Sequence, residues 1–137
     1  MHRTEVRVRF GETDPYGVVY FTSYLEYAKT ALDECLRTLG LSPAQFYRNA
    51  SGGWPIGEVT IRYEKPARYD DLIRVETTLA DVSSRTVTFD YAILNADSND
   101  RLATARTTLV SLDASSRVAT IPAEFRPMLR RAAGLPE

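Results

Sequence analysis

The sequence predicts one α+β domain, in which an antiparallel sheet of about five strands packs against one long helix. Residues 4–10 alternate between apolar and charged side chains, which is the pattern of a half-buried strand. A helical stripe of apolar residues then runs to about residue 39, and four further alternating stretches are joined by short polar turns. Strands joined by tight turns favour an antiparallel sheet, and a long helix with one apolar face must cover it.

The long helix is predicted from apolar residues that recur at helical spacing and form one continuous stripe. The stripe consists of Leu25, Ala28, Leu32, Cys35, Leu36 and Leu39. Gly40 follows at the place where a left-handed residue ends many helices, so the helix is expected to end at about residue 39. Ser42 and Pro43 then predict a second, short helix through about residue 48, because proline is favoured at the first helical position.

The second half of the chain supplies the remaining predicted strands. Alternating apolar residues indicate strands over residues 59–63, 72–80, 86–94 and 102–112, and a last brief strand is expected near residues 118–121. Residues 49–57 are predicted to form a loop that is rich in glycine and carries the single tryptophan. The segment after Pro122 has a weakly helical, basic pattern. No linker or internal repeat interrupts this order, so residues 1–137 are expected to form a single domain.

The composition is that of an ordinary globular protein, and it narrows the range of partners. The 137 residues include 44% hydrophobic and 26% charged residues. The net charge of −1 gives no global field that would attract nucleic acid or an anionic membrane. A single cysteine allows no disulfide within the chain, and the N-terminal residues contain no apolar signal core. We therefore expect a cytoplasmic protein without a nucleic-acid or membrane partner.

The residue types present argue against several kinds of catalytic site. The only histidine, His2, lies in the terminal segment, so no serine or cysteine nucleophile has a credible histidine base. The same scarcity of histidine and cysteine leaves no zinc site, and Cys35 lies on the apolar stripe of the helix. No glycine-rich phosphate-binding motif follows a strand. We therefore expect neither a metal nor a cofactor.

One carboxylate remains a candidate for catalysis, in the turn between the first strand and the long helix. Pro15 pushes Asp14 towards an extended conformation, and Gly17 allows a positive φ or a close backbone approach. Asp14 lies between aromatic and apolar segments, where partial burial would tune its basicity. The start of the following helix supplies unpaired amides that favour negative charge. The competing interpretation is that Asp14 only caps the helix or closes the turn.

The segment around this turn resembles the signature of hotdog-fold thioesterases of the 4-hydroxybenzoyl-CoA thioesterase class. The resemblance rests on Thr13–Asp14–Pro15, on Gly17–Val18–Val19–Tyr20 and on Tyr24–Leu25–Glu26–Tyr27. Residues 69–77 also look like the strand entry that follows the central loop in this family. Together with the matching order of elements, the likeness covers nearly the whole chain.

This resemblance implies a fold, an assembly and a pair of catalytic groups. In the family, an antiparallel sheet wraps around one central helix, and two subunits pair with active sites at their interface. By position, Asp14 would be the nucleophile or the general base, and the Phe21 backbone N–H would bind the thioester oxygen. Gly17, which has no side chain, would permit a close approach of the backbone at this turn. Many relatives have histidine and asparagine where this chain has Phe21 and Ser23, so only a backbone role survives at position 21.

Aromatic residues near the motif are candidates for the lining of an acyl pocket. They are Tyr20, Tyr24, Tyr27 and Trp54, and core packing is the competing interpretation for most of them. Arg85 falls where the family often places a basic contact to the phosphates of coenzyme A, although a solvated surface arginine would fit the same position.

These observations predict an acyl thioester hydrolase that releases a carboxylic acid from an acyl-CoA or from an acyl carrier protein. The resemblance further implies a homodimer that assembles into a homotetramer. The alternatives are a non-catalytic acyl-binding protein with the same fold and, less favoured, a hotdog dehydratase or hydratase. A dehydratase usually needs a histidine beside the acid, and His2 is badly placed for that role. The acid argues against the acyl-binding alternative, because a protein without catalysis would not need a carboxylate in an otherwise apolar hollow.

Overall fold

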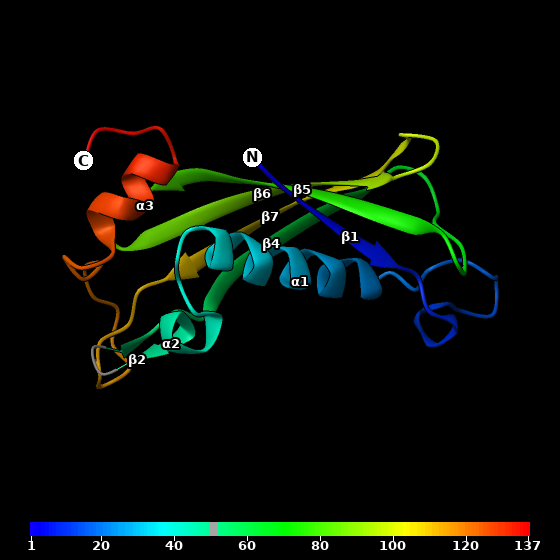
Figure 1. Cartoon of the computed structure of the whole chain (residues 1–137). Helices are drawn as coiled ribbons and strands as arrows, with labels where there is room; N and C mark the ends of the chain where they lie inside the picture. Colours follow the sequence, from blue (N-terminus) through cyan, green and yellow to red (C-terminus); the bar gives the residue numbers. More distant parts are fainter. Residues whose placement is uncertain (50–51) are drawn as a thin grey trace. The chain divides into compact units, whose positions relative to one another are not determined.

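The computed structural model describes residues 1–49 and 52–137 (Figure 1). These residues group into two compact units. The first unit comprises residues 1–35, 61–77 and 91–105, and the second comprises residues 36–60, 78–90 and 106–137.

The main sheet has five strands, as the alternating patterns predict. The strands are β1 (His2–Arg7), β4 (Ile56–Tyr63), β5 (Leu72–Val82), β6 (Thr86–Asn95) and β7 (Arg101–Val110). Their order across the sheet is β1-β5-β6-β7-β4, so β1 and β4 are the edge strands. β1 pairs antiparallel with β5, and its first residue lies opposite Thr77. The predicted sheet is confirmed, with strand ends that differ by only a few residues.

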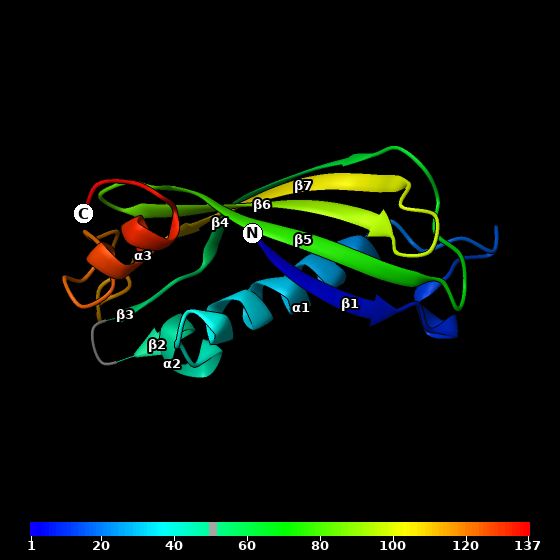
Figure 2. The ribbon, with the colours of Figure 1, turned by 45° about the horizontal axis from the view of Figure 1, so that its top comes forward.

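The core of the first unit forms where the long helix begins. Helix α1 (Ser23–Thr38) starts at the end of the Asp14 segment. Figures 1 and 2 both show β1 beside β5, with the first turns of α1 on one side of these strands. The largest fully buried side chains of this unit are Tyr27, Leu32, Ile73, Ile93, Val8 and Val75. Four of the six residues of the predicted stripe are buried, whereas Leu25 is half-buried and Leu39 lies beyond the end of the helix.

The second unit contains the shorter elements. Helix α2 (Pro43–Tyr47) leads into a hairpin of two-residue strands, β2 (Arg48–Asn49) and β3 (Gly52–Gly53), and Figure 2 shows this order. Helix α3 (Arg126–Ala132) follows Pro122, where weak helical character is predicted. Gly40, which ends α1, has φ +81°, as its predicted left-handed role requires.

An aromatic cluster forms the core of this second unit. Phe46 is 1% exposed, and its ring stacks on Trp54 at 4.9 Å between centroids with only 10° between the planes. Phe125 meets the same ring edge-on at 5.7 Å. These contacts hold α2 and the residues before α3 against the tryptophan, so Trp54 is a core residue of this unit.

Three details of the sequence-based description are wrong. Phe10 is 75% exposed, because β1 ends at Arg7 and the chain turns into a short 3₁₀ helix, η1 (Phe10–Glu12). The brief strand predicted near residues 118–121 is only an isolated bridge between Val118 and Leu112. The predicted loop over residues 49–57 contains the end of β2, all of β3 and the start of β4, and its residues 50 and 51 lie outside the described part of the chain.

Candidate active site

The turn that carries Asp14 is closed by backbone hydrogen bonds. The Asp14 N–H donates to the Val18 carbonyl at 2.9 Å, and the Gly17 N–H donates back to the Asp14 carbonyl at 2.9 Å. Thr13 and Val19 form an antiparallel bridge next to this pair. Gly17 has φ +79°, so the first of its two predicted uses, a positive φ, is confirmed. The short loop therefore holds the aspartate in one place.

The two oxygens of the Asp14 carboxylate have different surroundings. Oδ1 accepts hydrogen bonds from the Tyr16 N–H at 2.9 Å and, more weakly, from the Val18 N–H at 3.5 Å. Oδ2 accepts no hydrogen bond from residues 1–49 or 52–137. The side chain is partly buried, as predicted. The turn-closing interpretation is thus correct for one oxygen, and the other oxygen is left available for chemistry.

The chain between Asp14 and α1 presents an amide without a partner. The Tyr20 N–H donates to the Glu12 carbonyl at 2.8 Å, and the Ser23 N–H donates to the Tyr20 carbonyl at 2.9 Å. The Tyr63 hydroxyl donates to the Phe21 carbonyl at 2.5 Å. No acceptor in the described chain takes up the Phe21 N–H, which lies just before the first turn of α1. Such an amide can bind an anion or a polarised carbonyl.

Two buried tyrosines lie behind this segment. Tyr24 is 3% exposed, and its hydroxyl oxygen accepts a hydrogen bond from the Ala67 N–H at 3.1 Å. Burial raises the pKa of Tyr24, and the negative charge of Asp14 raises it further, so Tyr24 stays neutral. The rings of Tyr27 and Tyr63 lie edge-on to the Tyr24 ring at 6.1 and 5.2 Å between centroids. Tyr20, which is 45% exposed, packs on the Phe21 ring at 4.7 Å.

Sequence reasoning missed Glu12, which is the most connected residue of this segment. Its carboxylate accepts hydrogen bonds from the Arg9 backbone and guanidinium and from the Tyr27 hydroxyl. Burial alone would raise the pKa of Glu12, but these hydrogen bonds and the Arg9 charge outweigh it and hold the pKa below its ordinary value. The sequence does contain a signal for this residue, because Arg9 and Glu12 have opposite charges and lie three residues apart across a turn.

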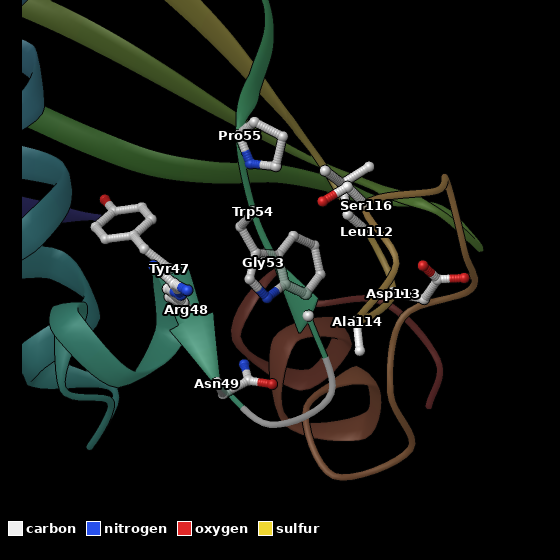
Figure 3. A pocket seen from close by; sticks show the side chains of 11 residues that line it. Tyr47, Arg48, Asn49, Gly53, Trp54, Pro55, Leu112, Asp113, Ala114 and Ser116 are labelled. Atoms are coloured by element: carbon white, nitrogen blue, oxygen red, sulfur yellow. The ribbon is translucent and has the colours of Figure 1, made fainter.

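The other two predicted binding residues belong to the second unit. Trp54 lines a hollow of about 670 Å³ together with Arg48, Asn49 and Asp113 (Figure 3). Arg85 is exposed in the turn between β5 and β6, and its N–H donates to the Ser83 hydroxyl at 3.3 Å. Asp14 does not line the hollow. A substrate contact by Trp54 or Arg85 remains a prediction.

The described chain offers no sign of a metal site or of a membrane span. Residues 1–49 and 52–137 contain no group of three histidine, cysteine, aspartate or glutamate side chains that could hold a metal ion. Within the same ranges, no helix has the length and apolarity needed to cross a bilayer.

The comparison with known proteins identifies the class. The model of the Thioesterase-like superfamily matches residues 8–131, so the chain belongs to this family. A curated relative, the 1,4-dihydroxy-2-naphthoyl-CoA hydrolase of Thermosynechococcus vestitus, is 34% identical over 100 residues, which cover 73% of this chain and 68% of that protein. The acyl-CoA thioester hydrolase YbgC of Escherichia coli is 31% identical over 113 residues, which cover 82% of this chain and 83% of that protein.

A solved structure agrees with these sequence matches. The 1,4-dihydroxy-2-naphthoyl-CoA thioesterase from Synechocystis superposes with a TM-score of 0.85 at 26% identity, over 93% of each chain. The predicted hotdog fold is therefore confirmed. The predicted class of enzyme, a thioester hydrolase, is confirmed as well.

Proposed function

We propose that this protein hydrolyses acyl-CoA thioesters, with Asp14 as the reacting carboxylate and the Phe21 N–H as the group that polarises the thioester carbonyl. One observation carries the proposal. Asp14 has one oxygen held by backbone amides and one oxygen uncommitted, on the same short loop as an unpaired amide at the start of α1. The helix dipole adds to the attraction for negative charge at that point.

The chemistry can follow either of two routes. As a general base, Asp14 takes a proton from water while the water oxygen attacks the carbonyl carbon, and the tetrahedral intermediate then expels the thiolate, which takes up a proton. As a nucleophile, Asp14 attacks the carbonyl carbon itself, and the tetrahedral intermediate expels the thiolate, which takes up a proton, to leave a mixed anhydride. Water then hydrolyses the anhydride, which releases the carboxylic acid and restores the Asp14 carboxylate. In both routes the carbonyl oxygen becomes negative, and the Phe21 N–H would stabilise that charge.

The names of the relatives support a class of substrate for this chain and do not identify one acyl group. The curated relatives act, by their names, on an aromatic 1,4-dihydroxy-2-naphthoyl thioester and on acyl-CoA, which supports an acyl-CoA substrate for this chain. Exposed and half-exposed aromatic side chains border the Asp14 segment, notably Tyr16, Tyr20 and Phe21. An aromatic acyl group could stack on such side chains. An acyl carrier protein remains the alternative carrier.

The test is a thiol-release assay over aromatic and aliphatic acyl-CoAs and one acyl carrier protein substrate. We expect turnover of at least one acyl-CoA. Turnover of the carrier-protein substrate alone would contradict the acyl-CoA assignment and favour an acyl carrier protein as the carrier. Binding of acyl-CoA without any thiol release would favour the non-catalytic alternative and contradict the proposal.

We further propose that residues 1–137 act as one hotdog domain and pair with a second copy, and that such dimers associate into a tetramer. The family model spans residues 8–131, which supports a single domain. The edge strand β4 supports the pairing, because all but one of its residues are exposed, including Ile56, Val59 and Tyr63 at 42–43%. An exposed apolar edge strand readily takes up another chain.

Light scattering at micromolar concentration should therefore give a mass of at least twice 15.4 kDa. The Val59→Lys variant should shift the mass towards the monomer, because a lysine on an edge strand opposes strand pairing. The Arg117→Lys variant, at an exposed position outside the sheet, serves as its control. A wild-type protein that scatters as a monomer would contradict the proposed assembly.

A further inference from the structure

We propose that Glu12 is a positioning residue, which fixes the Phe21 amide relative to Asp14 through the Tyr27 hydroxyl of α1. The inference rests on the proposed function of Asp14 and Phe21, and it assigns to Glu12 a role in the same reaction without contact to the substrate.

The side chain of Glu12 ties the residues before Asp14 to the helix that follows it. Oε1 accepts hydrogen bonds from the Arg9 N–H at 2.9 Å and from the Tyr27 hydroxyl at 3.0 Å. Oε2 accepts hydrogen bonds from the Arg9 guanidinium, at 3.1 Å from Nε and 3.0 Å from Nη2. Both oxygens are therefore used, and neither is left to act as an acid or base on a substrate.

The backbone of the same residue holds the start of the helix. The Glu12 carbonyl accepts hydrogen bonds from the Tyr20 N–H at 2.8 Å and from the Ser23 hydroxyl at 3.3 Å. Tyr20 and Ser23 lie on either side of Phe21 in the chain, and Asp14 lies only two residues after Glu12. Glu12 is thus linked to both proposed catalytic groups, to Asp14 through two peptide bonds and to the residues that flank Phe21 through hydrogen bonds.

Burial makes these contacts strong. The Glu12 side chain is only 11% exposed, and Tyr27 is 2% exposed, so water competes poorly for their hydrogen bond. A hydrogen bond to an ionised acceptor is also shorter and stronger than one between neutral groups. Burial and the neighbouring Glu12 charge raise the pKa of Tyr27, which therefore keeps its proton and remains the donor.

Such a link predicts a kinetic effect that a purely structural role would not produce. If the helix start moves relative to Asp14, the transition state loses stabilisation while the ground-state complex changes little. The variant Tyr27→Phe removes only the donated hydrogen bond and keeps the ring in the core. We expect kcat to fall about tenfold, with KM changed less than twofold.

Substitutions at Glu12 test the same link from its other end. Glu12→Ala should lower kcat more than Tyr27→Phe does, and Glu12→Gln should lower it less than Glu12→Ala, because the amide oxygen still accepts from Tyr27. The double variant of Glu12→Ala and Tyr27→Phe should be no slower than Glu12→Ala alone. The matched control is Glu64→Gln, since Glu64 forms an exposed pair with Arg101 at 2.5 and 2.8 Å in the same unit. The control should keep kcat.

Hydrogen exchange of the backbone amides separates this proposal from the proposed function. Exchange over residues 18–24 should accelerate at least about tenfold in Tyr27→Phe and stay unchanged in Glu64→Gln. If wild type releases no thiol from any substrate, the proposed function fails, and the exchange result alone decides whether Glu12 holds the helix start. Unchanged exchange in Tyr27→Phe, or a loss of thermal stability with kcat within twofold of wild type, would overturn the positioning role.

Discussion

Replacing Asp14 with asparagine should lower kcat/KM for acyl-CoA hydrolysis by about 10²- to 10⁴-fold, the usual contribution of a positioned general base. Asparagine has the same shape, and its side-chain oxygen can still accept the Tyr16 N–H that closes the turn. It is neither a useful base nor a useful nucleophile, because its amide is neutral. The variant therefore removes the chemistry and keeps the loop. Thiol release under saturating and limiting substrate measures the effect.

The chain offers a matched control for this substitution. Asp113 closes a similar turn, where its Oδ1 accepts the Ser115 N–H at 2.8 Å and the Arg117 N–H at 3.0 Å. Asp113→Asn should leave thiol release within about twofold of wild type, and both variants should melt close to the wild-type temperature. Equal activity of Asp14→Asn and wild type would rule out Asp14 as the reacting carboxylate.

The largest expected change in stability is that of Phe46→Ala, which should lower the free energy of unfolding by about 3–5 kcal/mol. Phe46 is 1% exposed, and its ring contacts Tyr47, Trp54 and Phe125 at 4.9–5.7 Å between centroids. Truncation to alanine would leave a cavity between these three rings, because a stacked indole cannot move into the space without losing its own contacts.

Urea unfolding followed by fluorescence suits this measurement, since Trp54 is the single tryptophan of the chain. The control is Val118→Ala, a residue of the same unit that is 58% exposed, and it should change the free energy of unfolding by less than about 0.5 kcal/mol. A loss below about 1 kcal/mol for Phe46→Ala would contradict the close packing of this aromatic cluster.

Most of the fold was predictable because its elements follow simple periodicities. The helical stripe from Ala28 to Leu36 and the alternation along β5 and β6 each match a buried face. The prediction failed at the end of the first strand, where contacts that the apolar alternation does not encode decide the conformation. Phe10 continues the apolar alternation of the first strand, but the hydrogen bond from the Asp70 N–H to the Val8 carbonyl and the Arg9–Glu12 contact turn the chain away before it.

The candidate site was predictable only in part. Asp14, Gly17 and the helix start follow from local turn chemistry and from the family motif, which both lie within one short stretch of sequence. Two hydrogen bonds join residues that are far apart in sequence. One runs from the Tyr63 hydroxyl to the Phe21 carbonyl, and the other from the Tyr27 hydroxyl to the Glu12 carboxylate. No spacing pattern in the sequence encodes such contacts, so these hydrogen bonds around the Phe21 amide can be identified only in the folded chain.

The central claim is that the Phe21 N–H stabilises the oxygen of the thioester while Asp14 drives its hydrolysis. The most direct test removes that N–H by replacing Phe21 with its α-hydroxy acid, so that the peptide becomes an ester with an unchanged side chain. The ester also weakens the Tyr20 carbonyl as the acceptor of the Ser23 N–H. The native Cys35 allows a synthetic segment of residues 1–34 to be ligated to an expressed segment of residues 35–137.

The same ester at exposed Gly11 controls for the weakened carbonyl, because it likewise weakens the Phe10 carbonyl as the acceptor of the Thr13 N–H. Thiol release from the best acyl-CoA substrate is the measurement. We expect kcat to fall about 10²- to 10³-fold for the ester at Phe21, the usual effect of losing one oxyanion donor, and to stay near that of wild type for the ester at Gly11. A kcat equal to that of wild type for the Phe21 ester would contradict the account.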